Sequence, residues 1–123
     1  MDFKELGRTG VKVPAIGVGT WGMGGDAARN TTGDEESIRA LKRAIELGMY
    51  LIDTAEMYGD GHCEELVGEA IKPFSREQLF IVSKVWRNHM HYADVIKAAE
   101  HSLRRLQTDW IDLYMIYFPN PEI

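Results

Sequence analysis

Short apolar runs alternate along this 123-residue chain with longer segments whose apolar residues recur at helical spacing. The runs are nearly continuous and rich in Ile, Val and Leu, which is typical of parallel strands covered on both faces. They predict four strands, at residues 16–19, 51–52, 79–83 and 113–116. Segments 3–6 and 11–13 flank a glycine-bearing connection and predict a short N-terminal β-hairpin.

Three helices are predicted between the strands. The first opens at Thr32-Gly33-Asp34-Glu35, which has the spacing of a capping box, and ends at Gly48. The second covers roughly residues 63–72 and stops before Pro73. The third covers about residues 93–106, where apolar residues again recur at helical spacing.

Strand–helix alternation allows two architectures, an open doubly wound sheet or a closed eightfold barrel. The repeat is about 30 residues long, and eight such units give roughly 250 residues, the usual size of a barrel. Four strands and three helices therefore predict an α/β fold that is the N-terminal half of a (β/α)8 TIM barrel. Residues 1–123 form one incomplete domain in this interpretation.

Each predicted strand is followed by, or ends on, a polar or ionisable residue. These residues are Thr20, Asp53, Lys84 and Tyr117. Because the carboxyl ends of parallel strands lie on one rim, where the connecting loops build the active site, we expect the four side chains to share one site.

The segment Gly17-Val18-Gly19-Thr20-Trp21-Gly22 also has the G-x-G-x-x-G spacing of a dinucleotide-binding fold. That fingerprint requires a helix opening at the last glycine, so that the helix N-terminus faces the pyrophosphate. Residues 23–33 instead contain three more glycines and no helical period. We therefore favour a glycine-rich loop at the rim, around a cofactor.

Lys84 ends an apolar strand, where its charge is costly unless a carboxylate pairs with it, and Asp53 on the adjacent strand is the expected partner. Tyr58 follows in the loop after Asp53. An ammonium about 4 Å from a phenol, at an effective dielectric of ~20, supplies roughly 4 kcal/mol. That is enough to lower the pKa of a phenol by about two to three pH units. Tyr58 is thus a predicted proton donor tuned by Lys84; without Lys84, Asp53 and Tyr58 would read as loop-capping and packing residues.

The composition narrows the class of protein further. The chain has 14 basic and 19 acidic residues, a formal charge of −5, which argues against nucleic acid or a membrane as partner. Its single cysteine, Cys63, suits a reducing compartment. No signal peptide and no apolar stretch of ~18 residues is evident, so we expect a cytoplasmic protein.

The histidines have a weaker claim to function. His89 and His91 are spaced for metal binding, but no Cys, Asp or Glu accompanies them in that loop, so no metal site is predicted. His62, His101 and Cys63 read as surface or helix-face residues.

Several segments of the chain resemble the aldo-keto reductase family. The likeness covers essentially the whole chain, with motifs in the order and spacing of the family. The matching segments are Leu6-Gly7-Arg8-Thr9-Gly10, Gly17-Val18-Gly19-Thr20-Trp21, Leu51-Ile52-Asp53-Thr54-Ala55 with Tyr58-Gly59, Val82-Ser83-Lys84-Val85-Trp86 and Asp109-Trp110-Ile111-Asp112-Leu113-Tyr114.

This resemblance implies that the protein reduces a small aldehyde or ketone with hydride from NADPH, with NADH possible. Tyr58 then takes the role of proton donor, and Asp53 and Lys84 take supporting catalytic roles. The resemblance also implies two binding groups. The positions that contact the cofactor are Gly19, Thr20, Trp21 and Asp53, and those that line the substrate pocket are Trp21, Trp86 and Tyr117.

One family position differs. The family usually has histidine at the end of the fourth strand, where this chain has Tyr117. A tyrosine hydroxyl still donates a hydrogen bond to a carbonyl oxygen, but it does not titrate near neutral pH as imidazole does. We therefore expect Tyr117 to orient the carbonyl, with altered substrate preference or weak activity.

The resemblance further implies that most contacts to the adenosine and 2′-phosphate of the cofactor come from strands five to eight. We therefore expect weak NADPH binding, or none, by these 123 residues alone. The sequence is then either a fragment of a longer gene product or a chain that pairs with a second half-barrel or forms a homodimer. Two other interpretations stay open: a cofactor-binding regulatory subunit, and a half-barrel that serves only in assembly.

Overall fold

The computed structural model describes residues 1–122, which form a two-stranded antiparallel hairpin and a four-stranded parallel sheet. The hairpin consists of β1 (Phe3–Glu5) and β2 (Lys12–Pro14). The sheet strands are β3 (Val18–Gly19), β4 (Leu51–Asp53), β5 (Phe80–Val85) and β6 (Leu113–Ile116). The α-helices are α1 (Asp34–Glu46), α2 (His62–Ile71) and α3 (Tyr92–Leu106), and three short 3₁₀ turns are η1 (Tyr58–Gly61), η2 (Arg76–Gln78) and η3 (Arg87–His89).

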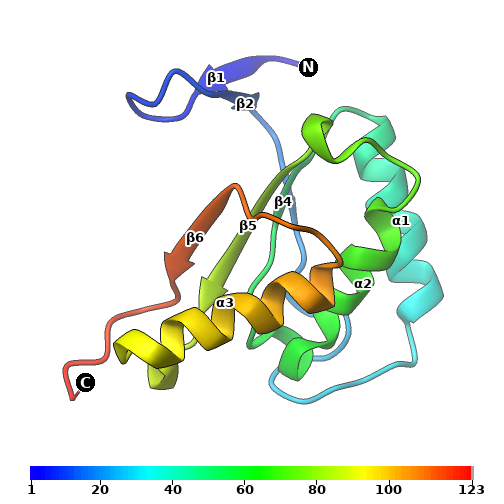
Figure 1. Cartoon of the computed structure of the whole chain (residues 1–123). Helices are drawn as coiled ribbons and strands as arrows, with labels where there is room; N and C mark the ends of the chain where they lie inside the picture. The colour runs from blue at the N-terminus through cyan, green and yellow to red at the C-terminus, as the bar shows by residue number, and fades with distance from the viewer. Residues whose placement is uncertain (123) are drawn as a thin grey trace.

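The strands pair in chain order, β3-β4-β5-β6, and every pair is parallel. The α-helices lie on one side of this sheet, with α2 between α1 and α3 (Figure 1). The predicted alternation is confirmed, and the helix and strand bounds differ from the predicted ones by at most two residues. Within residues 1–122, no helix is both long enough and apolar enough to cross a bilayer.

The N-terminal hairpin is confirmed and lies apart from the helices. Its register pairs Phe3 with Pro14 and Glu5 with Lys12. In Figure 1 the hairpin lies beside the end of the sheet at which β5 and β6 begin. The hairpin is therefore at the opposite end of the sheet from the carboxyl ends of the strands, where the predicted site lies.

The predicted capping box at the start of α1 is wrong. Gly33 is the N-cap residue and no side chain caps the helix. The turn before it is held differently, because the Asn30 side-chain oxygen accepts a hydrogen bond from the Thr32 N–H at 3.0 Å. Acidic residues in the first turn, among them Asp34, provide negative charge where the helix dipole favours it.

The core lies between the sheet and the helices, and α2 is its most buried helix. Eight of the ten residues of α2 are buried, against three of the fifteen residues of α3. Burial of this apolar surface is the main term that holds the layers together. The central cluster is Leu41, Ile45, Ile52, Val67, Ala70, Ile71, Leu79, Ile81 and Leu106.

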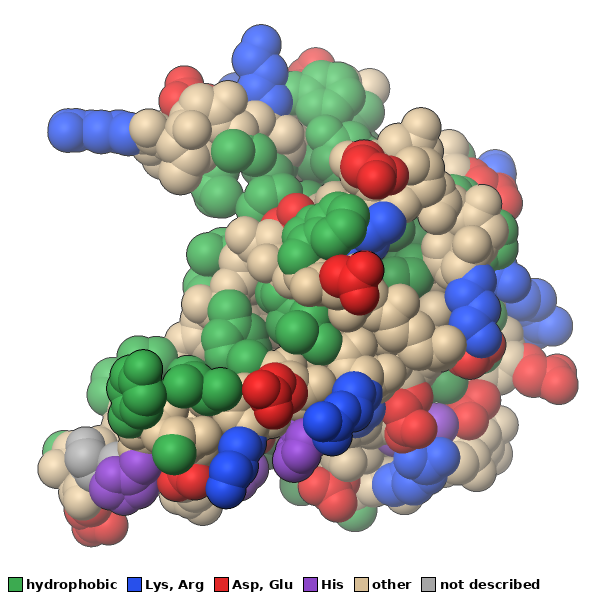
Figure 2. Space-filling model, in the orientation of Figure 1, with side chains coloured by type: hydrophobic (Ala, Val, Ile, Leu, Met, Phe, Trp, Pro, Cys, Tyr) green, Lys and Arg blue, Asp and Glu red, His purple; other side chains and the backbone are tan. Residues whose placement is uncertain are grey.

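The two outer strands, β3 and β6, are the edges of the sheet that the described residues form. Ile116 in β6 is 54% exposed, and Ile16 just before β3 is 61% exposed. Apolar side chains on these outer strands are thus exposed, because among residues 1–122 no further strand lies beside them. Figure 2 shows hydrophobic side chains at the surface at the lower left, where Figure 1 draws the start of α3 and the end of β6.

Candidate active site

Asp53 and Lys84 meet at the carboxyl ends of two neighbouring strands. The register of β4 and β5 pairs Asp53 with Val82, so Lys84 lies two residues further along. The Lys84 ammonium donates to both Asp53 carboxylate oxygens, at 2.8 and 2.9 Å, and to the Thr54 carbonyl oxygen at 2.8 Å. The Lys84 side chain is only 12% exposed, so these acceptors replace the water it has lost. The predicted ion pair is confirmed.

Tyr58 reaches the same ammonium from η1. Its hydroxyl lies 3.4 Å from the Lys84 nitrogen. The turn has an unusual backbone, with positive φ at Gly59, Asp60 and Gly61. A Cβ on Gly59 would lie 2.4 Å from the Gly24 carbonyl oxygen, so only glycine fits there. Close approach of two backbone segments thus fixes the turn that carries the phenol.

The expected tuning of the Tyr58 phenol is only partly correct. Burial raises the pKa of Tyr58, while the charge and hydrogen bond of Lys84 lower it, and burial outweighs them. The Tyr58 pKa is therefore above its ordinary value in this chain, and the predicted net decrease is wrong. The ring is 7% exposed, packed among aromatic side chains that disfavour the phenolate. Tyr58 is fully protonated at neutral pH.

The three residues predicted from the glycine-rich segment have different environments. Thr20 is fully buried, and its hydroxyl donates to the Asp53 carbonyl oxygen at 2.8 Å. This hydroxyl therefore links the ends of β3 and β4. Trp21 is 54% exposed, and its ring contacts that of Tyr58 with centroids 4.9 Å apart. A Cβ on Gly19 would meet no atom within 4 Å, so the backbone is open there. Their contacts with a cofactor stay predictions.

Aromatic side chains enclose the phenol on a second side. Tyr117 packs edge-on against Tyr58 and against Trp86, with centroid separations of 6.0 and 5.3 Å. The structure therefore brings Tyr117 and Trp86 to the predicted site. Phe118 joins them, 5.4 Å from Trp86 and 5.3 Å from Tyr117, and was missed by the sequence reasoning although it follows Tyr117 directly.

Two residues interpreted as surface or helix-face positions are buried. Cys63 is fully buried, and burial raises the pKa of its thiol. His62 is 5% exposed and holds a carboxylate at each ring nitrogen: Asp34 at 2.8 and 2.9 Å, and Glu65 at 3.2 Å. These contacts join α2 to the start of α1.

The two histidines that were considered for metal binding, His89 and His91, lie in and near η3. His89 contacts the Glu56 carboxylate, a partner from another loop, and His91 is the N-cap residue of α3. In residues 1–122 no group of three or more His, Cys, Asp or Glu side chains is placed to hold a metal ion.

The sequence profile of the Aldo/keto reductase family matches residues 15–123. The match covers most of the chain, and the chain belongs to this family.

Three similar proteins show how the chain relates to the family. Methylglyoxal reductase YeaE of Escherichia coli (strain K12) is 49% identical over 108 residues, which are 88% of this chain and 36% of that protein. The crystal structure of the thermostable aldo-keto reductase Tm1743 with the inhibitor epalrestat superposes with a TM-score of 0.98 at 56% identity, covering 100% of this chain and 45% of the other. An aldo-keto reductase from Klebsiella pneumoniae in complex with NADP and acetate gives a TM-score of 0.82 at 44% identity, covering 89% of this chain and 37% of the other.

The described residues therefore have the architecture of part of an aldo-keto reductase (β/α)8 barrel, as predicted. The chain spans less than half the length of each of these relatives.

Proposed function

We propose that this chain carries the catalytic half of an NADPH-dependent reductase of small aldehydes or ketones, and that residues 1–123 are the N-terminal half of its domain. One observation carries the proposal. A largely buried ammonium, held by Asp53, lies 3.4 Å from the hydroxyl of a buried tyrosine at the carboxyl ends of parallel strands. That is the place where barrel enzymes put their chemistry.

In the proposed reaction, Tyr58 gives its proton to the carbonyl oxygen as negative charge develops there. Lys84 stabilises the phenolate that remains, because its ammonium is in hydrogen-bond range of the phenol oxygen. Asp53 holds the Lys84 ammonium in place through hydrogen bonds to both of its carboxylate oxygens. When bound, the nicotinamide supplies the hydride to the carbonyl carbon. The high pKa of Tyr58 keeps the proton in place until that charge develops.

The described residues suit the nicotinamide end of such a cofactor. Trp21 offers an exposed ring beside Tyr58, and the open backbone at Gly19 leaves room for a ligand. The described residues offer less to the phosphates of the cofactor, which bind to cations. Within residues 1–122, Lys84 is the one cation hydrogen-bonded to Asp53 and Tyr58, and Asp53 neutralises its charge. We therefore expect only weak NADPH binding; a fluorescence titration giving low-micromolar affinity for the monomer would contradict this.

The activity is best tested in a completed barrel. Residues 1–123 would replace the corresponding part of Tm1743, since the two backbones superpose with a TM-score of 0.98. NADPH oxidation is then followed with methylglyoxal, suggested by the similarity to YeaE, and with a simple aldehyde. We expect Tyr58→Phe to slow turnover by about 100-fold or more, since general acid catalysis contributes 10²–10⁴.

Tyr50→Phe is the matched control, because Tyr50 packs against Phe3 near the hairpin, away from the site. It should leave the rate unchanged. A Tyr58→Phe chimera that keeps the parent rate would reject Tyr58 as proton donor. Rapid turnover by the parent would in turn exclude the regulatory-subunit interpretation.

The role of Tyr117 is tested in the same chimera. Its ring packs edge-on against both Tyr58 and Trp86, beside the phenol that donates the proton in the proposed reaction. We expect Tyr117→His to change the rates or the order of preference among aldehydes, because imidazole both donates a hydrogen bond and titrates near neutral pH. Identical rates for parent and variant would reject a role for Tyr117 in substrate orientation.

The exposed outer strands favour assembly as a second candidate function. Ile116 leaves an apolar side chain on an edge strand that has free backbone groups, a surface suited to another half-barrel or a second copy. Sizing chromatography with light scattering should show a defined dimer. A monomer at high concentration would argue against it. We also propose a cytoplasmic location, because Cys63 is free and buried.

A further inference from the structure

Glu64 is a fully buried carboxylate on α2 that the proposed reaction does not use. One of its oxygens accepts a hydrogen bond from the Ser83 hydroxyl at 2.6 Å, and the other accepts one from the Arg105 Nε–H at 2.6 Å. A buried charge persists only where it is paired and hydrogen-bonded, and here both oxygens have partners. These partners come from two different elements, β5 and α3.

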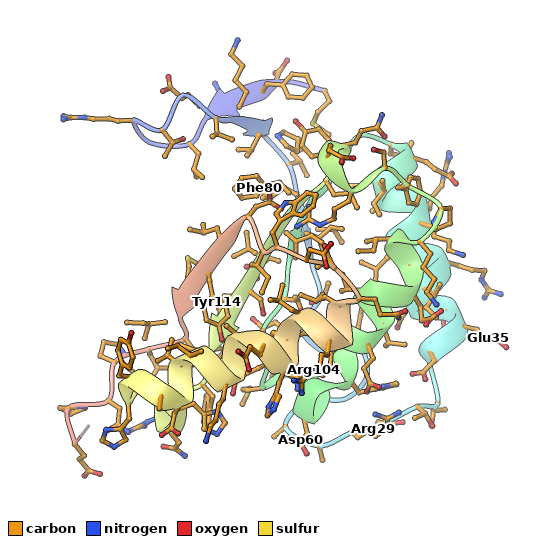
Figure 3. The ribbon with its side chains drawn as sticks, in the orientation of Figure 1. Arg29, Glu35, Asp60, Phe80, Arg104 and Tyr114 are labelled. Atoms are coloured by element: carbon orange, nitrogen blue, oxygen red, sulfur yellow. The ribbon has the colours of Figure 1, made fainter. Side chains whose placement is uncertain are left out.

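The Ser83 bond holds the strand that carries Lys84. Side chains alternate across a strand, so Ser83 faces the helices while Lys84 faces the opposite side. Tyr114, the register partner of Ser83, lies between β6 and α3 (Figure 3), which places this layer behind the catalytic face. Glu64 therefore holds β5 from behind, one residue before Lys84.

The Arg105 bond supports the turn that carries Tyr58. A Cβ on Gly61 would lie 3.0 Å from Arg105 Cδ and 3.1 Å from its Nε, so the arginine side chain packs directly against this glycine. Gly61 has φ of +93° and is the last residue of η1, which begins at Tyr58. The Arg105 guanidinium is held by a second contact, since it donates to the Ser102 hydroxyl at 3.3 Å.

We propose that Glu64 is a positioning residue that sets the separation between Lys84 and Tyr58. It acts from behind the sheet, through Ser83 on one side and Arg105 on the other. The proposal rests on the proposed function, in which Tyr58 is the proton donor, but its test does not require turnover.

The test is the pKa of Tyr58 in this chain, measured by NMR titration of tyrosine labelled with ¹³C at Cζ. The chain has five tyrosines, and Tyr58→Phe identifies the signal. In Glu64→Gln the new amide N–H₂ can still donate to the Ser83 hydroxyl, but the contact with Arg105 loses the carboxylate charge that strengthens it. If the contact holds Lys84 near the phenol, the Tyr58 pKa should rise by about half a pH unit or more.

The sign of the change separates positioning from simpler effects. Loss of a nearby negative charge by itself would lower the pKa of a phenol, whereas retreat of the ammonium raises it. An unchanged or lower Tyr58 pKa in Glu64→Gln, even with a lower melting temperature, would overturn the proposal. Glu65→Gln is the matched control, since Glu65 contacts Arg29 and His62 instead and should leave the Tyr58 pKa unchanged. An equal rise in the control would also overturn it.

If Glu64→Gln does not fold, Ser83→Ala replaces it, because this change removes one contact and leaves the Glu64–Arg105 pair intact. The Tyr58 pKa should then rise by a smaller amount, and an unchanged value overturns the proposal. If Glu64→Gln raises the Tyr58 pKa while the chimera shows no reduction, positioning stands and the proposed function fails.

Discussion

The centre and the edge of this part of a barrel differ in how completely their residues are buried. At the centre, β5 has four buried residues of six, and α2 is buried along most of its length. At the edge, β6 has no buried residue, and only three of the fifteen residues of α3 are buried. Asp53, Lys84 and Tyr58 belong to the centre. The chain therefore places its proposed catalytic cluster beside its well-packed strand β5 and helix α2, whereas the outer strand β6 stays open.

This difference in burial predicts that the same substitution lowers the free energy of unfolding more at the centre than at the edge. Ile52 in β4 is fully buried, so Ile52→Ala should lower the free energy of unfolding by about 2–5 kcal/mol. The loss combines the transfer of apolar atoms to water with the cavity they leave. Urea denaturation followed by circular dichroism measures it.

The matched control is Ile116→Ala in β6, where the side chain is 54% exposed. Its effect on the unfolding free energy should stay within about 0.5 kcal/mol. Similar losses for the two variants would show that the edge is covered in solution, and the contrast between the regions would then be wrong.

Glycines sharpen the comparison. A Cβ on Gly68 in α2 would lie 2.6 Å from the Arg105 carbonyl oxygen, whereas one on Gly19 in β3 would meet nothing within 4 Å. Gly68→Ala should therefore destabilise the chain by about 1–3 kcal/mol through overpacking between α2 and α3. Gly19→Ala should be nearly neutral, and urea denaturation followed by circular dichroism measures both variants. A neutral Gly68→Ala would mean that α2 and α3 separate at little cost.

The smallest effect is expected at Glu65 in α2, whose side chain is 43% exposed although most of the helix is buried. Burial raises the pKa of Glu65, but hydrogen bonds from Arg29 and His62 lower it more, so the net pKa is below its ordinary value. A lowered folded-state pKa gives stability that is present above the unfolded pKa of about 4.3 and lost as pH falls through the folded value. This contribution should be below about 1 kcal/mol, since the pair is screened by water.

Urea denaturation of the parent and of Glu65→Gln, at pH 7 and at pH 3, measures this contribution. The parent should be the more stable protein at pH 7, and the difference should shrink at pH 3. A difference of the same size at both pH values would show that the carboxylate charge contributes nothing.

Some features of the fold and the site could be predicted from the sequence, because they depend on a local apolar pattern or on residues at the ends of adjacent strands. The strand predicted at residues 113–116 is β6 without change. Lys84 at the end of an apolar strand required an acceptor, and Asp53 ended the adjacent strand, so their pairing followed from the cost of a buried charge.

The buried contacts of Glu64 were not predicted from the sequence, although its position on α2 gave one sign of them. It lies three and seven residues before Val67 and Ile71, on the apolar face of α2, so an acidic residue interrupted that face. Its partners are 19 and 41 residues away along the chain, and no local rule connects them. The environment of His62 was missed for the same reason, because Asp34, whose carboxylate contacts its ring, is 28 residues away.

The sequence by itself determined the alternation of strands and helices, the rim on which polar residues gather, and the pairing of a lysine with an aspartate. Side-chain periodicity and the cost of an unpaired charge are properties that a linear pattern records. Only the tertiary structure decided the direction of the Tyr58 pKa. That direction depends on how much water is removed from the phenol, and Trp21 and Tyr117, which pack against its ring, come from segments far apart in the chain.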